Sequence, residues 1–487
     1  MKREADAVLF ARPRRASIGA RAIGTLQATY LATLCSCAFT TSTGPSAPIL
    51  ATVTVSLKAT TITVGQSVAA SAAGLDQAGA SINVGLVSWN TGSTAIATVT
   101  SDGAVTGVAP GQTQILASVG GKLGQATITV TTALTPLRFT TLTTGWGFTC
   151  GLADAGAAYC WGRSDFGQLG DGGPTTRSTP TSVQGGRPFT ALTSGDFHSC
   201  ALTATGAAYC WGHNLYGELG EGALGDEFAP MPVLGGLTFT AITAGHLHSC
   251  ALTSTGATYC WGANSAGELG DGTTTRRLTP NLIFGGTTFA SVAAGWSLTC
   301  GLTTAGAALC WGLTFFGSPV TAPGLVPGGL TYTALTVGEA TACGLTSAGA
   351  AYCWDVFAAA TPVPGGIALR AISLWGNVAQ GLYFEVPGHA CGLTSAGEAY
   401  CWGNNGAGEL GDGTQVYRVT PTRVLGGLRF TGITAGPFHT CAWTGAGAAY
   451  CWGSNDSGEL GDGTATFRTA PALVSGGSIS ARRTLTP

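Results

Sequence analysis

Fourteen of the sixteen cysteines occur in seven pairs, and nine residues separate the two members of each pair. Paired cysteines can remain buried thiols in a strand interior, ligate a metal, or form a disulfide. A nine-residue gap does not fit the ligand spacing of zinc sites. Buried thiols and disulfides are therefore the two interpretations to weigh for these pairs, which are Cys150 and Cys160, Cys200 and Cys210, Cys250 and Cys260, Cys300 and Cys310, Cys343 and Cys353, Cys391 and Cys401, and Cys441 and Cys451.

The turn inside each pair favours the disulfide. In the third unit, Ser254-Thr255-Gly256 is a three-residue loop that ends in Gly, as in a common type of hairpin. If Thr253 pairs with Ala257, Cys250 faces Cys260 at a non-hydrogen-bonded position, where the α-carbons lie about 4.5 Å apart. This separation is at the short end of what a disulfide tolerates. We therefore expect seven cross-strand disulfides, each contributing about 2–3 kcal/mol, and an oxidising compartment.

Other residue types that could do chemistry do not form a site. His198, His248, His389 and His439 each stand two residues before the first cysteine of a unit, but they lie on different units, too far apart for zinc ligands. We expect them to be structural. The acidic Gly-Glu-Leu-Gly-Asp-Gly loops offer one or two carboxylates each, whereas calcium takes six or more oxygens. We expect no catalytic residue, no metal and no cofactor.

The seven units repeat at spacings of 50, 50, 50, 43, 48 and 50 residues. Each has short segments rich in Thr, Ile, Tyr, Leu and Trp separated by Gly-bearing turns, which is typical of strands. After the second cysteine come Trp-Gly, the Gly-Glu-Leu-Gly-Asp-Gly loop and an apolar run such as Pro280–Phe284. Four strands per unit in a ring make a β-propeller. The fold class predicted is all-β, with a seven-bladed propeller whose Trp residues pack between blades.

These motifs resemble the repeats of the regulator of chromosome condensation (RCC1) family: an Ala-Gly strand, His-x-Cys-Ala-Leu, a turn Gly, Tyr-Cys-Trp-Gly, Gly-Glu-Leu-Gly-Asp-Gly and Thr-Pro. The resemblance spans 136–477 and implies a seven-bladed propeller. Eukaryotic members of that family are guanine-nucleotide exchange factors that bind chromatin. No exchange motif is visible here, the net charge is −2, and the 478–487 tail has two arginines, Arg482 and Arg483, so we expect no nucleic-acid partner.

A separate unit precedes the propeller at 49–132. About seven short strand-like runs, such as Val53–Val55 and Ala126–Val130, predict a β-sandwich. The unit resembles the bacterial Ig-like domain (group 2) at Val87-Ser88-Trp89, Ile96–Val99 and Asp102–Val108. That resemblance implies a spacer or adhesive module of a bacterial surface or secreted protein.

The first 37 residues have the character of a leader, with arginines before a modest apolar stretch. Leu34-Cys35-Ser36-Cys37 resembles a bacterial lipoprotein processing site, in which Cys37 would be lipidated and anchor the protein to a membrane. An ordinary leader with incidental cysteines is the alternative, and both stay open. Residues 38–48 are expected to be a linker, and no later stretch is long and apolar enough to span a membrane.

Departures from the repeat concentrate aromatic residues. Unit four has Phe315 and Phe316 where the acidic loop is lost, and unit six gains about eleven residues that include Trp375, Tyr383 and Phe384. Insertions in a repeat array map to loops on one face, which favours a binding surface. Aromatics that refill the core of a degenerate blade are the alternative.

Together these features predict an exported, non-catalytic binding or adhesion protein, expected to be a monomer, with an extracytoplasmic protein or glycan partner at a bacterial cell surface. The Ig-like unit would be a stalk and the propeller a disulfide-stapled platform. Two alternatives remain: an exchange-factor-like regulator, and an inhibitor of an extracellular hydrolase such as a β-lactamase. An enzyme is the remotest of the classes considered.

Overall fold

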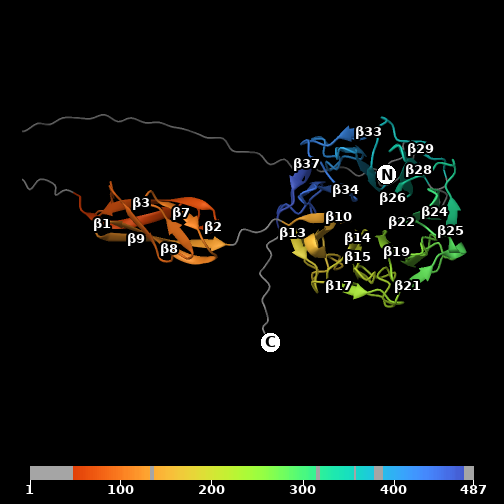
Figure 1. Ribbon diagram of the computed structural model, residues 1–487, viewed down its shortest axis with the longest axis horizontal. Helices are drawn as coiled ribbons and strands as arrows, with labels where there is room; N and C mark the ends of the chain where they lie inside the picture. Colours follow the sequence, from red (N-terminus) through yellow and green to blue (C-terminus); the bar gives the residue numbers. More distant parts are fainter. Residues whose placement is uncertain (1–47, 132–136, 314–317, 356–357, 378–387, 477–487) are drawn as a thin grey trace, which may run out of the picture. The chain divides into compact units, whose positions relative to one another are not determined.

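A computed structural model describes residues 48–131, 137–313, 318–355, 358–377 and 388–476 of the 487-residue chain. The described residues are nearly all β, and they form two compact units divided between Ala133 and Leu134. Figure 1 shows both units as strands and loops. Among the described residues there is no helix with the length and apolarity needed to cross a bilayer.

The first unit is a β-sandwich of two sheets, with strand orders β1-β3-β7-β6 (β4 pairs with β3) and β2-β9-β8-β5. Ile62, Val105, Ile115 and Ile128 are buried between the sheets. The strands are β1 (Leu50–Leu57), β2 (Thr61–Thr63), β3 (Ser67–Asp76), β4 (Ser81–Ile82), β5 (Ser88–Thr91), β6 (Ala97–Val99), β7 (Ala104–Gly107), β8 (Gly111–Val119) and β9 (Lys122–Thr131). The sandwich is confirmed, and β2 and β4 are additional to the predicted runs.

The second unit is a propeller of seven four-stranded antiparallel sheets that follow one another round a ring (Figure 1). Blade 1 has β10 (Phe139–Gly145), β11 (Phe148–Ala153), β12 (Ala158–Gly162) and β13 (Arg177–Ser182); blade 2 has β14 (Ala191–Ser194), β15 (His198–Leu202), β16 (Ala208–Gly212) and β17 (Glu227–Pro232); blade 3 has β18 (Ala241–Ala244), β19 (His248–Leu252), β20 (Thr258–Gly262) and β21 (Arg277–Leu282); blade 4 has β22 (Ser291–Ala294), β23 (Leu298–Leu302), β24 (Ala308–Leu313) and β25 (Pro319–Leu325).

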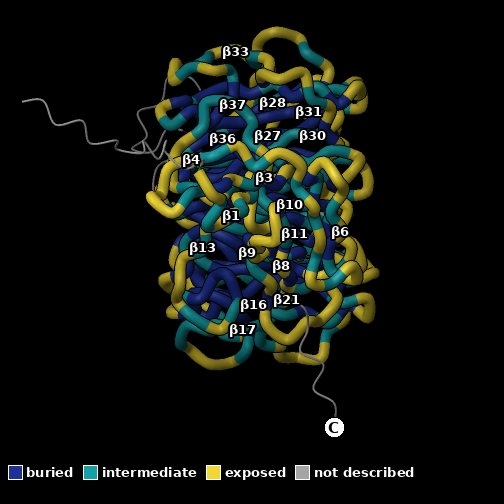
Figure 2. The backbone as a smooth tube through the Cα atoms, turned by 90° about the vertical axis from the view of Figure 1, so that its left-hand side faces the viewer, coloured by how far each residue is buried: buried dark blue, intermediate teal, exposed yellow. Residues whose placement is uncertain are grey.

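The remaining blades continue the order. Blade 5 has β26 (Ala334–Val337), β27 (Thr341–Leu345), β28 (Ala351–Asp355) and β29 (Thr361–Pro362); blade 6 has β30 (Ala371–Trp375), β31 (His389–Leu393), β32 (Ala399–Gly403) and β33 (Arg418–Arg423); blade 7 has β34 (Gly432–Ala435), β35 (His439–Trp443), β36 (Ala449–Gly453) and β37 (Arg468–Leu473). Two 3-10 turns, η1 (Asp154–Gly156) and η2 (Phe284–Gly286), lie in loops. Buried residues follow the second and third strands of the blades, whereas the loops are mostly exposed (Figure 2).

The hairpin register places the cysteines opposite one another. In blade 3, Leu252 faces Thr258, Ala251 faces Tyr259 and Cys250 faces Cys260. The same register recurs in every blade, and it brings the two members of each predicted pair face to face.

All seven cysteine pairs form disulfides between the second and third strands of their blades. Closing such a short loop in the unfolded chain removes entropy worth about 3 kcal/mol per disulfide. Each blade therefore carries its own covalent staple. The α-carbons lie 4.0–4.1 Å apart in the bonds Cys150 to Cys160, Cys200 to Cys210, Cys250 to Cys260, Cys300 to Cys310, Cys343 to Cys353, Cys391 to Cys401, and Cys441 to Cys451. These separations are shorter than the predicted value of about 4.5 Å, which applies to opposed residues that no covalent bond joins.

The fourth strand begins earlier than the sequence predicts. Prediction placed it at Pro280–Phe284, but β21 runs from Arg277 to Leu282. The reason is a register shift between Cys260 and Gly262, which brings Arg277 opposite Gly262. The basic residue at the start of the strand is thus aligned with the acidic loop that precedes it.

Neighbouring blades are joined by a buried hydrogen bond from an indole to a loop carbonyl. Trp211 Nε1 donates to the Gln168 carbonyl at 3.0 Å, and the Ser199 hydroxyl shares that acceptor at 3.3 Å. We call this arrangement the blade joint. Its indole bonds, 2.8–3.0 Å long, are Trp161 to Glu459, Trp211 to Gln168, Trp261 to Glu218, Trp311 to Glu268, and Trp452 to Glu409.

The loop glycine at this joint has a steric purpose. A β-carbon at Gly170 would lie 2.7 Å from Trp211 Nε1, and Gly170 has φ +65°. Gly461 is in the same situation against Trp161. A side chain there would push the loop carbonyl away from the indole, so this Gly of the repeated loop is required by the joint.

The ring closes without strand exchange, because every blade is a contiguous segment of chain. Blade 7 meets blade 1 through the same bonds that join other blades. Trp161 Nε1 donates to the Glu459 carbonyl at 2.9 Å, and the Gly463 amide donates to the Ser178 carbonyl at 3.0 Å. The boundary that closes the ring therefore has the same blade joint as the other boundaries that keep the acidic loop.

The joint is incomplete where the acidic loop is lost. Trp354, in blade 5, is 2% exposed, and its indole nitrogen has no hydrogen-bond acceptor among the described residues. An unpaired buried polar group costs free energy. The blade 4–blade 5 boundary is therefore expected to be weaker than the boundaries that keep the loop.

This difference makes a testable contrast. We expect Trp211→Phe to lower the free energy of unfolding of the propeller by about 1–2 kcal/mol more than Trp354→Phe, because of the two indoles only that of Trp211 has a hydrogen-bond acceptor among the described residues. Guanidinium denaturation of both variants measures the difference, and their matched burial makes each the control for the other. If Trp354→Phe lowered the free energy of unfolding as much as Trp211→Phe or more, the proposed contribution of the indole hydrogen bond to stability would be contradicted.

Candidate functional site

Backbone hydrogen bonds fix the ends of the inner strands around the central channel. The Trp146 amide donates to the Asp196 carbonyl, and the His246 and Trp296 amides donate to the Gly295 and Gly338 carbonyls, each at 3.0 Å. Each bond joins one blade to the next. Because the bonds use backbone alone, they hold the chain in place whatever side chain stands there.

Aromatic side chains from five blades gather at this end of the channel. The Trp146 ring centroid lies 5.1 Å from that of Phe438, 5.9 Å from those of Phe197 and Trp375, and 6.2 Å from that of Trp296. All five are half-buried. We call these five residues the channel-mouth cluster. Half-exposed Trp and Phe in one place are typical of binding anchors.

Polar groups hold the cluster in position. The Asp196 carboxylate accepts from Trp375 Nε1 at 3.3 Å and contacts His246 Nδ1 at 2.6 Å. The His246 ring stacks on Trp296, with centroids 3.8 Å apart and planes 7° apart. One buried carboxylate thus orients rings contributed by blades 3, 4 and 6.

The aromatic surface continues outward over blades 1 and 2. Phe166 lies 5.7 Å from Phe197 and 5.0 Å from His213, between ring centroids. Tyr216 and Leu215 beside them are exposed. Burial lowers the pKa of His213, but the hydrogen bond and the charge of the Glu218 carboxylate together raise the pKa by more, so the net shift is upward.

A cavity of about 190 Å³ lies inside the ring of inner strands. Asp196, His246, Trp296, Glu339 and Trp375 line it at the channel mouth, and small, hydroxyl and aliphatic residues of the inner strands line the remainder. A water needs about 10–15 Å³ of such space. The cavity therefore has room for a group of several atoms.

The two faces of the propeller differ in charge. The mouth face, formed by the loops after the first and third strands of each blade, has sixteen described carboxylates against six arginines; the opposite face has two carboxylates against five arginines. The mouth-face residues are Asp165, Asp171, Asp196, Glu218, Glu221, Asp226, Glu227, Glu268, Asp271, Glu339, Asp355, Glu409, Asp412, Asp456, Glu459 and Asp462, with Arg163, Arg177, Arg276, Arg277, Arg418 and Arg468.

The charges of the opposite face are Asp154 and Glu398, with Arg138, Arg187, Arg370, Arg423 and Arg429. The mouth face is thus negative and the opposite face positive, although the whole chain is close to neutral. Such an asymmetry steers a charged partner to one face.

Of the aromatic residues predicted as a binding surface, Trp375 belongs to the channel-mouth cluster. Phe315, Phe316, Tyr383 and Phe384 lie outside the described residues, as does Cys37. Sequence reasoning did not find Trp146, Phe197, Trp296 or Phe438. The available signal was their place one or two residues after the Gly that ends or directly follows the inner strand of each of these blades.

The four repeated histidines join blades rather than bind metal. His248 Nε2 lies 2.8 Å from the Thr299 hydroxyl, which itself donates to the Glu268 carbonyl at 2.9 Å. Because the hydroxyl proton goes to the carbonyl, the ring must donate through Nε2. His198, His389 and His439 contact Ser249, Thr440 and Thr149 at the same distance.

Burial lowers the pKa of each of these histidines to about 3, so they are neutral at ordinary pH. Their Nδ1 atoms are buried and have no partner among the described residues. This is consistent with a neutral ring that carries its proton on Nε2.

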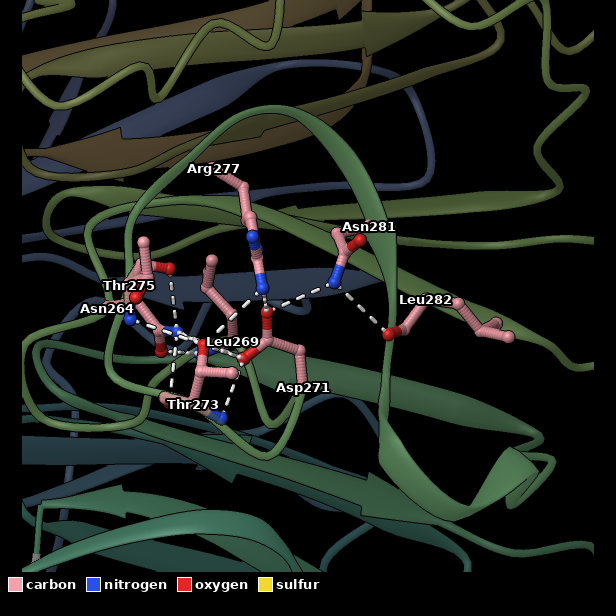
Figure 3. Close-up of polar contacts among 8 residues, drawn as sticks. All are labelled: Asn264, Leu269, Asp271, Thr273, Thr275, Arg277, Asn281 and Leu282. Atoms are coloured by element: carbon pink, nitrogen blue, oxygen red, sulfur yellow. Dashed lines mark hydrogen bonds and ion pairs between the residues drawn. The ribbon is translucent and has the colours of Figure 1, made fainter.

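The loop carboxylate of blade 3 is already satisfied by protein groups. Asp271 accepts from Asn264, Thr273, Arg277 and Asn281, and Figure 3 shows these donors surrounding it. Burial raises the pKa of Asp271, but the bonds from Thr273 and Arg277 together lower it by more. Within the described ranges, no group of three or more His, Cys, Asp and Glu side chains could hold a metal. These loops are turns locked by an ion pair.

Blade 2 departs from this pattern. Glu227 stands opposite Gly212, where blades 1, 3, 6 and 7 have an arginine. Burial and the Glu227 charge raise the pKa of Glu221, the carboxyl of that loop. The change adds to the negative charge beside the aromatic surface.

Comparison with known families identifies the repeats. The model described as "Regulator of chromosome condensation (RCC1) repeat" matches residues 155–202, 205–252, 255–302 and 396–443, and a second model with that description matches 139–168, 189–218, 239–268 and 430–459. The chain carries RCC1 repeats. The Bacterial Ig-like domain (group 2) model matches 49–130, so the first unit is a domain of that kind.

Several solved structures are similar to this one. The structure of human WBSCR16 is 18% identical with a TM-score of 0.57, covering 66% of this chain and 94% of that one. Prp20p from Saccharomyces cerevisiae, whose description names binding to Gsp1p and histones, is 20% identical (TM-score 0.42), covering 70% and 77%. The ectodomain of the Physcomitrella patens receptor kinase CR4 is 22% identical (TM-score 0.44), covering 65% and 74%. The likeness to WBSCR16 shows a shared fold and nothing further.

No curated protein matches the sequence. The seven disulfides of the RCC1 propeller and the bacterial Ig-like domain point to an oxidising, extracytoplasmic environment.

The buried histidines give the RCC1 propeller a defined pH dependence. Between pH 6.5 and about 3 the unfolded chain binds protons at four histidines that stay neutral when folded, so stability falls as the pH falls. Each contributes about 1.4 kcal/mol per pH unit. We expect His248→Leu, which copies Leu298 of blade 4, to reduce the slope of the free energy of unfolding against pH by that amount. Urea denaturation between pH 4.5 and 6.5 measures it, and an unchanged slope would contradict a neutral buried His248.

Proposed function

We propose that this chain is an exported, non-catalytic binding protein that holds a protein partner on the mouth face of its RCC1 propeller. The observation that carries the proposal is the channel-mouth cluster. Five half-buried aromatic side chains from five blades expose apolar area in one place, while the groups beneath them are fixed by backbone bonds. Rigid aromatic anchors of this kind dominate protein–protein binding energies.

Export is supported by the cysteine chemistry. The seven cysteine pairs are disulfides in the cores of the blades, where a reducing compartment would leave fourteen buried thiols. The Ig-like domain would then be the spacer between the propeller and the cell, in keeping with the surface and secreted proteins in which such domains occur. Lipidation at Cys37 remains part of this proposal as the means of anchoring.

A non-catalytic role is supported by the way titratable groups are used. Four histidines join blades, and the loop aspartates of blades 1, 3, 6 and 7 pair with arginines of their own loops. Inhibition of an extracellular hydrolase is one form that protein binding could take. The exchange-factor alternative requires a cytosolic protein, which the redox state of the cysteines tests.

The export part is tested on the native protein. After thiol alkylation without reductant, we expect the intact mass to carry no alkyl group on any of the fourteen propeller cysteines, and the protein to be absent from the cytosolic fraction. Alkylation after reduction and denaturation is the control, because it should add fourteen groups to the propeller. Cytosolic protein with fourteen reactive thiols would contradict export and put the exchange-factor function first.

The binding part is tested with a partner captured from the envelope and medium and then purified. We expect Trp146→Ala to weaken that partner's Kd by at least 30-fold, since Trp146 is at the centre of the cluster. Arg429→Ala on the opposite face is the control and should leave the Kd unchanged. Near-UV circular dichroism checks that Trp146→Ala is folded. Equal affinity in Trp146→Ala, or retention of polysaccharide in place of protein, would contradict the proposal.

A further inference from the structure

The channel mouth combines two features that act on the same kind of ligand. Its walls include Trp296 and Trp375, and its carboxylates are those of Asp196 and Glu339, all lining one cavity of about 190 Å³. Tryptophan rings attract cations that lie within about 6 Å of the ring centroid. A carboxylate nearby attracts the same ligands by its charge, and both attractions are stronger where water is displaced.

The charge around the mouth is not neutralised by the arginines of that face. Arg177, Arg277, Arg418 and Arg468 each pair with the aspartate of their own loop, at 2.6–2.8 Å. Asp196, in contrast, has a histidine and an indole as its partners. The mouth face keeps an excess of carboxylates, and the positive charge of the propeller is concentrated on the opposite face.

A bare metal ion does not fit this site. Calcium takes six to eight oxygen ligands, and no metal-holding group of acidic, His or Cys side chains occurs in the part of the chain that the structure describes. The half-buried aromatic area around Asp196 instead suits a ligand that has apolar carbon as well as positive charge. The methylene stem of Lys or Arg supplies the carbon, and its head supplies the charge.

We propose that the channel mouth takes the cationic end of a lysine or arginine side chain from the partner protein. The side chain enters among Trp146, Trp296 and Trp375, with its stem on the rings and its head directed toward Asp196 and Glu339. This inference rests on the proposed function, because it specifies the chemistry of the partner that binds to the mouth face. It adds that the partner's contact surface is basic.

The first test uses a minimal probe with the whole protein. Nα-acetyl-arginine amide should quench the tryptophan fluorescence saturably, and Nα-acetyl-citrulline amide, its uncharged analogue of nearly the same shape, should bind at least 10-fold more weakly. Asp196→Asn keeps an oxygen for Trp375 but removes the charge, so it should weaken the arginine probe about 5- to 10-fold. Asp154→Asn on the opposite face is the matched control and should have no effect. Equal binding of the two probes, or no saturable binding of the arginine probe, would overturn the proposal.

The second test separates this inference from the proposed function by using the captured partner. If a basic side chain enters the mouth, raising NaCl from 50 to 500 mM should weaken the Kd at least 10-fold, and Asp196→Asn should weaken it about 10-fold. A partner that needs Trp146 but is indifferent to salt and to Asp196→Asn would overturn the inference and leave the proposed function standing. A partner that is indifferent to Trp146→Ala would overturn the proposed function itself.

Discussion

The propeller depends on one repeated interaction, the carbonyl in the acidic loop of one blade that accepts the indole N–H of the next. Among the described residues five boundaries have this bond, and at each of them a Ser or Thr hydroxyl donates to the same carbonyl. The bond is buried, so breaking it would leave polar groups without water. It fixes the direction of each loop, and the loop glycine, the Trp and the histidine opposite the hydroxyl all follow from it. Where the loop is lost, Trp354 keeps its buried place without an acceptor among the described residues.

The disulfides stabilise the hairpin within each blade, whereas the blade joints stabilise the contact between neighbouring blades. Each disulfide closes a hairpin within a blade, between Cys250 and Cys260 for example, and does not cross a boundary. The joints hold one blade to the next. The fold therefore combines covalent staples inside its units with hydrogen bonds between them, and the closing boundary between blades 7 and 1 has no extra covalent support among the described residues.

Much of this architecture could be predicted from the sequence, because it is local and repeated. The gap between Cys250 and Cys260 and the Gly-ending turn determine the hairpin register, and seven copies in one register indicate seven blades. The start of β21 was missed because Arg277 aligns with Gly262 through a register shift that alternation does not reveal. In the Ig-like domain, β2 and β4 are too short and polar to stand out.

The channel-mouth cluster could not be predicted for a different reason. Trp146 and Trp375 are 229 positions apart in sequence and meet because the ring brings the ends of all inner strands together. Each alone looks like an ordinary aromatic residue in a variable loop. Trp375 drew attention as part of an insertion, whereas its partners stand in units without an insertion. The aromatic residues of different blades meet only because the ring closes, and the sequence of a single repeat holds no information about this meeting.

The backbone bonds around the channel mouth have a consequence for evolution and for engineering. Since the backbone at Trp146, His246 and Trp296 is bonded through its own amides, an exchange of the side chain at each position leaves these bonds in place. The ends of the inner strands thus have a fixed backbone on which different side chains can be placed, comparable to the variable loops of an antibody on its constant framework. Randomising these few codons while keeping the rest of the gene would yield a library of binders that share one covalently stapled frame.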